Sequence, residues 1–346
     1  MKHSKDDLRQ MQSLPLSAKI LMTKRRVRDW YEYWDGQVYV SFSGGKDSTV
    51  LLHIARELYP DIEAVFVNTG LEYPEIQQFV KTFDNVTILR PKMRFDEVIK
   101  KYGYPIISKA VGNCIVGAKR KPNGVKYKQI CGVYETNGKL SKFNYGKYKP
   151  LLDVDFNVSD ECCAVMKKAP IKEFAKYNDK TPIIATMACE SENREMVWLK
   201  TGCNAFESKN PQSKPMSFWT EQDVLKYIRE NNIPIAPVYG DIVYKEDSDQ
   251  MSLDDFGFDL GRKLCTTGCN RTGCIFCAFG AHLEQRDGGR SRFERLKETH
   301  PRQYEYCIGG GEYVDGVWRP NKQGLGMGHV FDELNKIYGD DFIKYK

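Results

Sequence analysis

The chain has 346 residues, of which 41% are hydrophobic and 28% charged, a balance typical of a globular protein that buries a sizeable core. No stretch approaches the run of about 18 apolar residues that a membrane-spanning helix needs, and the charged residues 1–12 are not a secretory signal. Eleven cysteines without such a signal favour metal-binding or redox cysteines in a reducing, cytoplasmic compartment. The net charge of +6 is too small to imply a polyanionic partner by itself.

The first part of the chain predicts helices before any strand. Residues 1–16 are expected to form a mobile tail, and residues 17–34 predict a basic amphipathic helix whose charges face solvent. Residues 38–48 then read V-Y-V-S-F-S-G-G-K-D-S, and the apolar residues that follow recur at helical spacing. This succession predicts a strand, a tight loop and a helix.

The predicted loop has the features of a phosphate site. A glycine-rich turn at a helix N-terminus directs backbone N–H groups and a positive dipole end toward one spot. Gly44 and Gly45 allow close approach of the backbone, and Lys46 adds a positive charge.

Further strands and helices alternate along the chain. Strands are predicted over residues 61–68, 86–89 and 182–187, and helices over residues 75–83 and 95–102. Such alternation predicts an α/β fold with a doubly wound, mostly parallel sheet that binds ligands at the carboxyl ends of its strands.

Two motifs in this part resemble those of a known enzyme superfamily. The S-G-G-K-D-S sequence of residues 43–48 resembles the pyrophosphate loop of the N-type ATP pyrophosphatases, or adenine nucleotide α-hydrolases. Residues 68–75 resemble their second nucleotide-contacting segment, although an asparagine replaces the usual aspartate at position 68. The resemblance implies that Thr69, Gly70 and Glu72 contact the nucleotide together with the loop.

Later motifs resemble one branch of that superfamily, the phosphoadenosine phosphosulfate (PAPS) reductase family. The C-C-A-V-M-K-K-A-P-I sequence of residues 162–171, the E-S-E-N-R of residues 190–194 and the W-T-E-Q-D-V succession from residue 219 follow the family's order. The resemblance implies a Rossmann-like PP-loop domain over residues 17–260. A cysteine-rich C-terminal region, residues 261–346, is expected to pack on it.

Four clustered cysteines leave two metal interpretations open. Cys265, Cys269, Cys274 and Cys277 alone would suit a tetrahedral zinc site. In the cluster-bearing members of the family, a C-C pair joins a distant C-x-x-C pair, which implies a [4Fe–4S] cluster held by Cys162, Cys163, Cys274 and Cys277. Cys265 and Cys269 would then be spare thiols.

Residues 117–149 differ in composition from the rest of the chain. They hold nine lysines and arginines against one acidic residue, with five aromatic residues interleaved and glycines that divide them into short pieces. They are expected to form a hairpin-like insertion. Two interpretations stay open: an interface for tRNA or DNA, and a solvated loop.

The complete loop resembles the loop of the ATP-cleaving members of the family rather than that of the sulfonucleotide reductases. It implies an adenylating enzyme that cleaves ATP to AMP and pyrophosphate and passes sulfur from a donor protein or thiol to its acceptor. Lys46 would stabilise pyrophosphate, Asp47 would hold Mg²⁺, Ser43 and Ser48 would orient phosphate oxygens, and Arg194 would face the acceptor anion. The alternatives are a PAPS or adenylylsulfate reductase that releases sulfite, and a nucleic-acid-binding module without turnover. The sequence does not indicate the oligomeric state.

Overall fold

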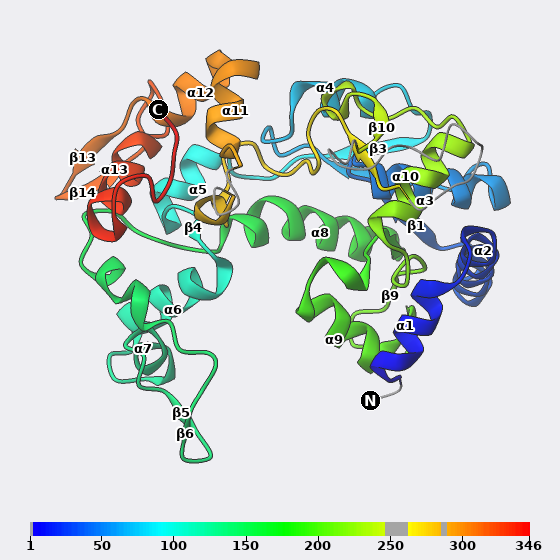
Figure 1. Cartoon of the computed structure of the whole chain (residues 1–346), viewed down its shortest axis with the longest axis horizontal. Helices are drawn as coiled ribbons and strands as arrows, with labels where there is room; N and C mark the ends of the chain where they lie inside the picture. Colours follow the sequence, from blue (N-terminus) through cyan, green and yellow to red (C-terminus); the bar gives the residue numbers. More distant parts are fainter. Residues whose placement is uncertain (1–2, 246–261, 285–288) are drawn as a thin grey trace. The chain divides into compact units, whose positions relative to one another are not determined.

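The chain divides into two compact units that interleave along the sequence. The computed structural model describes residues 3–245, 262–284 and 289–346 (Figure 1). The first unit comprises Met1–Asn68, Glu72–Leu89 and Ile171–Thr272. The second comprises Thr69–Leu71, Arg90–Pro170 and Gly273–Lys346.

The first unit is built on a six-stranded sheet in the order β3-β2-β1-β7-β9-β8. Its strands are β1 (Val38–Ser41), β2 (Ala64–Val67), β3 (Val86–Leu89), β7 (Thr181–Ile184), β8 (Asn204–Ala205) and β9 (Gln212–Ser213). All neighbouring strands run parallel except β8 and β9. The sheet extends to both sides of β1, as in a doubly wound fold, and the apolar runs of β1 and β2 are buried as a parallel sheet requires.

Helices and one hairpin complete this unit. The helices are α1 (Lys5–Ser13), α2 (Leu16–Tyr33), α3 (Lys46–Leu58), α4 (Pro74–Val80), α9 (Glu192–Thr201) and α10 (Glu221–Glu230), with the 3₁₀ turns η3 (Ala188–Glu190) and η4 (Pro237–Tyr239). The antiparallel pair is β10 (Ile242–Tyr244) and β11 (Leu264–Thr266). Large aromatic side chains fill the core: Trp30, Tyr39, Phe218 and Trp219 have no exposed surface.

The second unit is mostly helical. Its helices are α5 (Phe95–Tyr102), α6 (Lys109–Arg120), α7 (Val125–Ile130), α11 (Arg292–Thr299), α12 (Pro301–Ile308) and α13 (Met327–Tyr338), with the short turns η1 (Gly146–Leu152), the π-helical η2 (Ala164–Lys168) and η6 (Ala281–Leu283). Its strand pairs are β4 (Ile106–Ile107) with β12 (Ala278–Phe279), β5 (Glu135–Thr136) with β6 (Lys139–Leu140), and β13 (Glu312–Val314) with β14 (Val317–Arg319). One of the points where the chain passes between the units falls within α8 (Ala169–Asn178), after Pro170.

The predicted fold class is confirmed, but the organisation of the chain differs in two respects. Residues 5–13 form α1 instead of a mobile tail, because Ser4 and Asp7 form a capping box and Leu8 is buried. The expected boundary between residues 260 and 261 lies outside the described residues. Residues 273–346 group with residues 90–170 rather than with the sheet.

Among the described residues, no helix is long and apolar enough to span a membrane.

The backbone at Gly103 and Gly138 yields a stability prediction. Both have positive φ, +118° and +71°, but a Cβ on Gly103 would lie 2.5 Å from the backbone of Asn157, whereas a Cβ on Gly138 would meet open space. We expect Gly138→Ala to lower the free energy of unfolding by about 1 kcal/mol, from backbone strain alone. Gly103→Ala should cost at least about 2–3 kcal/mol because the clash adds to the strain. Equal losses in urea unfolding would contradict this.

Candidate active site

The loop between β1 and α3 is closed by its own serine side chains. The Ser43 N–H donates to Ser48 Oγ at 3.1 Å, and the two hydroxyl oxygens lie 3.0 Å apart. Ser48 Oγ also donates to the Gly45 carbonyl at 3.0 Å, and the Gly45 N–H reaches Ser43 Oγ at 3.3 Å. These bonds hold the loop in one shape at the N-terminus of α3.

Gly44 is required at the tightest point of this loop. Its φ is +69°, where side chains other than glycine are strained. A Cβ there would also lie 2.8 Å and 2.9 Å from the side-chain methyl groups of Val80 and Ile76 on α4. The glycine therefore lets α4 pack directly against the loop.

Lys46, the first residue of α3, presents a fixed positive charge. Its side chain is only 6% exposed. Its Nζ lies 3.3 Å from Glu221 Oε1 and 5.3 Å from the centre of the Tyr239 ring. Burial raises the pKa of the Tyr239 phenol to about 12, so this ring stays neutral beside the lysine.

A cavity of about 490 Å³ opens beside this lysine, within the first unit. It lies where β1 and β7 end, the usual position of a ligand site in a parallel α/β sheet. Its lining includes Ser43, Gly45, Lys46, Asp47 and Ser48 from the loop, Met187, Cys189, Glu190 and Arg194 after β7, Glu221 and Tyr239, and Asn270, Arg271 and Thr272.

On the side of the cavity that the residues after β7 form, two arginines share one carboxylate. Glu190, whose side chain is 8% exposed, forms ion pairs with both Arg194 and Arg271 and accepts a hydrogen bond from the Met187 N–H at 3.0 Å. One buried carboxylate therefore orients two guanidinium groups. Burial raises the pKa of the Asp47 carboxyl in the same cavity, while Lys46 and Arg271 oppose that rise.

The strand-like segment before Arg271 is held against η4. The N–H groups of Gly268 and Cys269 donate to the carbonyls of Tyr239 and Val238, each at 2.9 Å. A Cβ on Gly268 would lie 2.5 Å from the Val238 carbonyl oxygen, so only glycine fits. This contact places Arg271 in the cavity.

The structure brings most of the predicted nucleotide residues together, but not all. Ser43, Gly45, Lys46, Asp47, Ser48 and Arg194 line the cavity, and Gly44 shapes the loop. Thr69, Gly70 and Glu72 do not belong to the lining that the described residues form. Glu221, Tyr239 and Arg271 were missed as site residues. Glu221 lies within the W-T-E-Q-D-V motif, which served only to indicate the family, and Arg271 lies among the cysteines that were read as metal ligands.

The second unit brings together the four cysteines of the cluster interpretation. Cys162, Cys163, Cys274 and Cys277 line one small cavity, with Lys167 beside them. Cys162 and Cys163 directly precede the π-helical turn η2. The Cys277 N–H donates to the Cys274 carbonyl at 3.0 Å, which closes a turn just before β12.

The thiols of this cavity have different acidities. A hydrogen bond from Cys162, aided by the charges of Lys109 and Lys167, lowers the pKa of Cys163, while the same bond and burial raise the pKa of Cys162. Burial also raises the pKa of Cys277, and Arg292 donates to its carbonyl at 2.8 Å. Cationic side chains thus surround a group of thiols.

The four cysteines of the zinc interpretation are divided between the units. Cys265, in β11, and Cys269 belong to the first unit, whereas Cys274 and Cys277 belong to the second. Cys269 donates its thiol hydrogen to the Arg271 carbonyl at 3.3 Å. In the described part of the chain, no three His, Cys, Asp or Glu side chains are spaced to hold a single metal ion.

The fold and the first cavity define a class of protein: an α/β protein with a cavity beside a glycine-rich loop at the carboxyl edge of a parallel sheet. Comparison with known families agrees. The family "Phosphoadenosine phosphosulfate reductase domain" matches residues 37–110 and 125–278. The chain belongs to the PAPS reductase family, a branch of the PP-loop superfamily.

Two individual relatives share 30% or less of their aligned residues with this chain. An uncharacterized protein of Methanocaldococcus jannaschii is 30% identical over 336 residues, which is 92% of this chain and 59% of that protein. The chain thus spans about three fifths of the length of that relative. The adenosine 5'-phosphosulfate reductase of Bacillus cereus strain ZK is 23% identical over 225 residues, which is 63% of this chain and 74% of that enzyme.

Solved structures show weaker likeness. A PAPS reductase from Candida auris, in a phosphate complex, has 14% identity and a TM-score of 0.35 over 68% of this chain and 91% of its own. The FMN adenylyltransferase of Candida glabrata has 12% identity and a TM-score of 0.37 over 71% of this chain and 74% of its own. At TM-scores this low, the family assignment rests on the sequence matches.

The double pairing of Glu190 yields a second stability prediction. Glu190→Gln removes the charge that both arginines share, while the amide oxygen still accepts from the Met187 N–H. We expect the free energy of unfolding to fall by about 1–2 kcal/mol, a modest loss because both arginines are partly exposed. Glu192→Gln, which changes an exposed carboxylate in the first turn of the following helix α9, is the control and should lose less than about 1 kcal/mol. Similar losses in both variants would show that Glu190 has no special role.

Proposed function

We propose that the protein is an ATP-dependent adenylating enzyme that cleaves ATP between its α- and β-phosphates. The observation that carries this proposal is the buried Lys46 at the N-terminus of α3, in a cavity of about 490 Å³. A buried cation that a carboxylate and an aromatic ring hold in place is ready to stabilise a developing polyphosphate charge. Sulfonucleotide reduction expels no pyrophosphate and has no need of such a group.

In the proposed reaction, the loop residues act on the phosphates of ATP. An oxygen of the acceptor attacks the α-phosphorus, the bond from this phosphorus to the bridging oxygen breaks, and pyrophosphate leaves. The loop N–H groups and Lys46 stabilise the leaving pyrophosphate, and Ser43 and Ser48 orient phosphate oxygens. Asp47 would supply an oxygen ligand for Mg²⁺, which neutralises charge on the phosphates when it is bound. A sulfur nucleophile from a donor protein or thiol then displaces AMP from the acceptor.

The arginine pair supports an anionic acceptor. Arg194 and Arg271 together carry two charges against the single carboxylate of Glu190. Asp47 and Glu221 add two carboxylates to the same cavity, so no net charge is left over. The two guanidinium groups held on Glu190 can still pair with a sulfate, a carboxylate or a backbone phosphate of the acceptor. This extends the acceptor role predicted for Arg194 to a second residue.

Thiol-dependent reduction is the second candidate, and Cys189 is the observation that favours it. This exposed cysteine lines the same cavity. In that reaction its thiolate would attack the sulfur of a sulfonucleotide and expel the nucleoside phosphate, and a second thiol would then release sulfite and leave a disulfide. Burial raises the pKa of Cys189, which disfavours the thiolate. Cys307, the cysteine nearest the C-terminus, has no exposed surface and donates to Met327 Sδ at 3.4 Å, so it is poorly placed as a mobile nucleophile.

We also propose that Cys162, Cys163, Cys274 and Cys277 hold a [4Fe–4S] cluster. The donor set fits: four thiols line one cavity, and Lys109, Lys167 and Arg292 lie where they offset thiolate charge. A cluster lets each thiolate bind a different iron, so it does not require the four sulfurs to converge on one ion. When bound, a cluster would supply electron transfer or a site for sulfur.

ATP turnover should depend on Lys46. We expect Lys46→Ala to lower the rate of pyrophosphate and AMP release by about 100-fold or more, since the clamp on the leaving group is lost. The measurement is pyrophosphate release from ATP with tRNA, DNA or sulfate added. Lys24→Ala, a partly exposed lysine of the same unit paired with Glu57, is the control and should keep the parent rate.

Three other outcomes of this assay would contradict the proposal. Pyrophosphate release by Lys46→Ala at the parent rate would mean that the loop is not the site of cleavage. Sulfite release from adenylylsulfate that requires Cys189 and not Lys46 would instead establish the reductase. A protein that does neither would fit the binding module.

Metal content should separate the cluster from zinc. Protein purified without oxygen should be brown and contain iron, and Cys163→Ser should lose it, while Cys269→Ser keeps it because Cys269 lies in the other unit. Zinc analysis is the control measurement. A colourless zinc protein that loses its metal in Cys269→Ser and keeps it in Cys163→Ser would reject the cluster.

A further inference from the structure

A rigid hairpin lies within the basic segment of residues 117–149. Strands β5 and β6 are joined by Asn137 and Gly138, whose φ values of +55° and +71° suit a two-residue hairpin turn. The Asn144 side chain accepts from the Tyr134 N–H and donates to the Tyr134 carbonyl, both at 2.9 Å. Figure 1 shows the hairpin projecting beyond α7.

The segment carries an uncompensated positive charge. Its nine basic residues face a single acidic residue, a larger surplus than the +6 of the whole chain. Eight of the nine are exposed: Lys119, Arg120, Lys121, Lys128, Lys139, Lys142, Lys147 and Lys149. None of the nine forms an ion pair with a carboxylate of the described residues.

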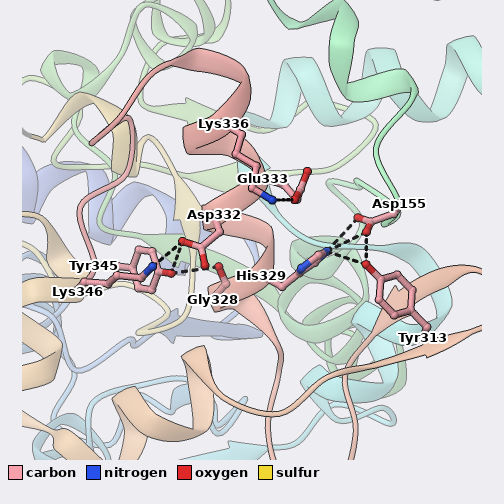
Figure 2. A network of polar contacts seen from close by, with 9 residues as sticks. All are labelled: Asp155, Tyr313, Gly328, His329, Asp332, Glu333, Lys336, Tyr345 and Lys346. Atoms are coloured by element: carbon pink, nitrogen blue, oxygen red, sulfur yellow. Dashed lines mark hydrogen bonds and ion pairs between the residues drawn. The ribbon is translucent and has the colours of Figure 1, made fainter.

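Two exposed lysines elsewhere in the same unit are paired with carboxylates, as Figure 2 shows. Lys336 lies 2.5 Å from Glu333, and Lys346 lies 2.9 Å from Asp332. Each of those charges is balanced within the protein. The lysines of the basic segment have no such partner among the described carboxylates, and a bound anion would balance their charge.

The segment also exposes apolar surface between its charges. Phe143 is 52% exposed and Leu140 is 67% exposed, next to the hairpin turn. Lys142 Nζ lies 5.4 Å from the centre of the Phe143 ring. An exposed ring beside lysines can stack on an unpaired base while the lysines contact the neighbouring phosphates. A membrane surface is a poorer fit, because the segment presents a hairpin and not an amphipathic helix with a broad apolar face.

We propose that residues 117–149 bind an unpaired strand of nucleic acid, with Lys139, Lys142 and Lys147 on phosphates and Phe143 stacked on a base. This activity does not depend on the proposed ATP chemistry, since the segment lies in the second unit and the phosphate cavity in the first. Binding should therefore occur without ATP and survive Lys46→Ala.

The test uses the full chain and a fluorescent single-stranded oligonucleotide of about 20 nucleotides, longer than the roughly 4–16 nucleotides that such sites cover. The triple variant K139Q/K142Q/K147Q should weaken binding at least about tenfold. It should also reduce the slope of log K against log salt by about 2, because a protein that has lost three phosphate contacts releases fewer counterions on binding. Phe143→Ala should weaken binding about tenfold and leave the salt slope unchanged, because stacking is not electrostatic.

Matched controls use residues with the same chemistry elsewhere. K336Q/K344Q/K346Q removes three lysines that pair with carboxylates, and Tyr177→Ala removes a ring that is 89% exposed on α8. Both should bind like the parent. Losses in the control variants equal to those in the hairpin variants would overturn the proposal, as would unchanged binding in the triple variant. Duplex of the same length bound as tightly as the single strand, or phosphatidylserine vesicles bound in preference to it, would overturn it as well.

Discussion

The closure of the loop after β1 is the constraint on which the cavity beside Lys46 depends. Two serine hydroxyls and the left-handed backbone of Gly44 turn the chain within a few residues, so that α3 starts directly beneath the cavity. The N–H groups of the first helical turn and Lys46 then point to the same place. Since α4 packs on Gly44 without a side chain between them, the loop is supported from behind and cannot easily open.

Around the cavity of the first unit, buried Lys46 and Glu190 each have oppositely charged neighbours. Lys46 has Glu221, and the carboxylate of Glu190 serves two arginines. A buried charge without such a partner would cost several kcal/mol. The same groups line the cavity. An anionic ligand could take the place of a carboxylate as the partner of Lys46 or of an arginine. Stability and recognition therefore use the same side chains.

Much of the sheet could be predicted from the sequence, because local pattern decides it. Strand β3 and helix α5 occupy the residues predicted for them, and a local capping box of Thr220 and Asp223 starts α10. The S-G-G-K-D-S motif predicted the loop and Lys46. These features depend on residues close in sequence, so a single chain contains the information.

The rest depends on contacts between distant residues, which no local pattern reports. Glu221, Tyr239 and Arg271 enter the cavity from three separate segments. The cysteine-rich stretch appeared to be one metal motif, yet the division between the units falls after Thr272, so its first half builds the phosphate cavity and its second half the group of thiols. The helix over residues 5–13 was missed because its charges obscured the capping box and the single buried leucine.

The interleaving of the two units has a consequence for the order of events during synthesis. Neither unit is a continuous piece of chain, and the second takes its parts from residues 69–71, 90–170 and 273–346. Strand β4 cannot pair until β12 has left the ribosome, and Cys162 and Cys163 wait equally long for Cys274 and Cys277. Such late, long-range closure slows folding and leaves apolar surface exposed on the nascent chain. A ligand held by all four thiols could therefore be acquired only after Cys277 has been synthesised.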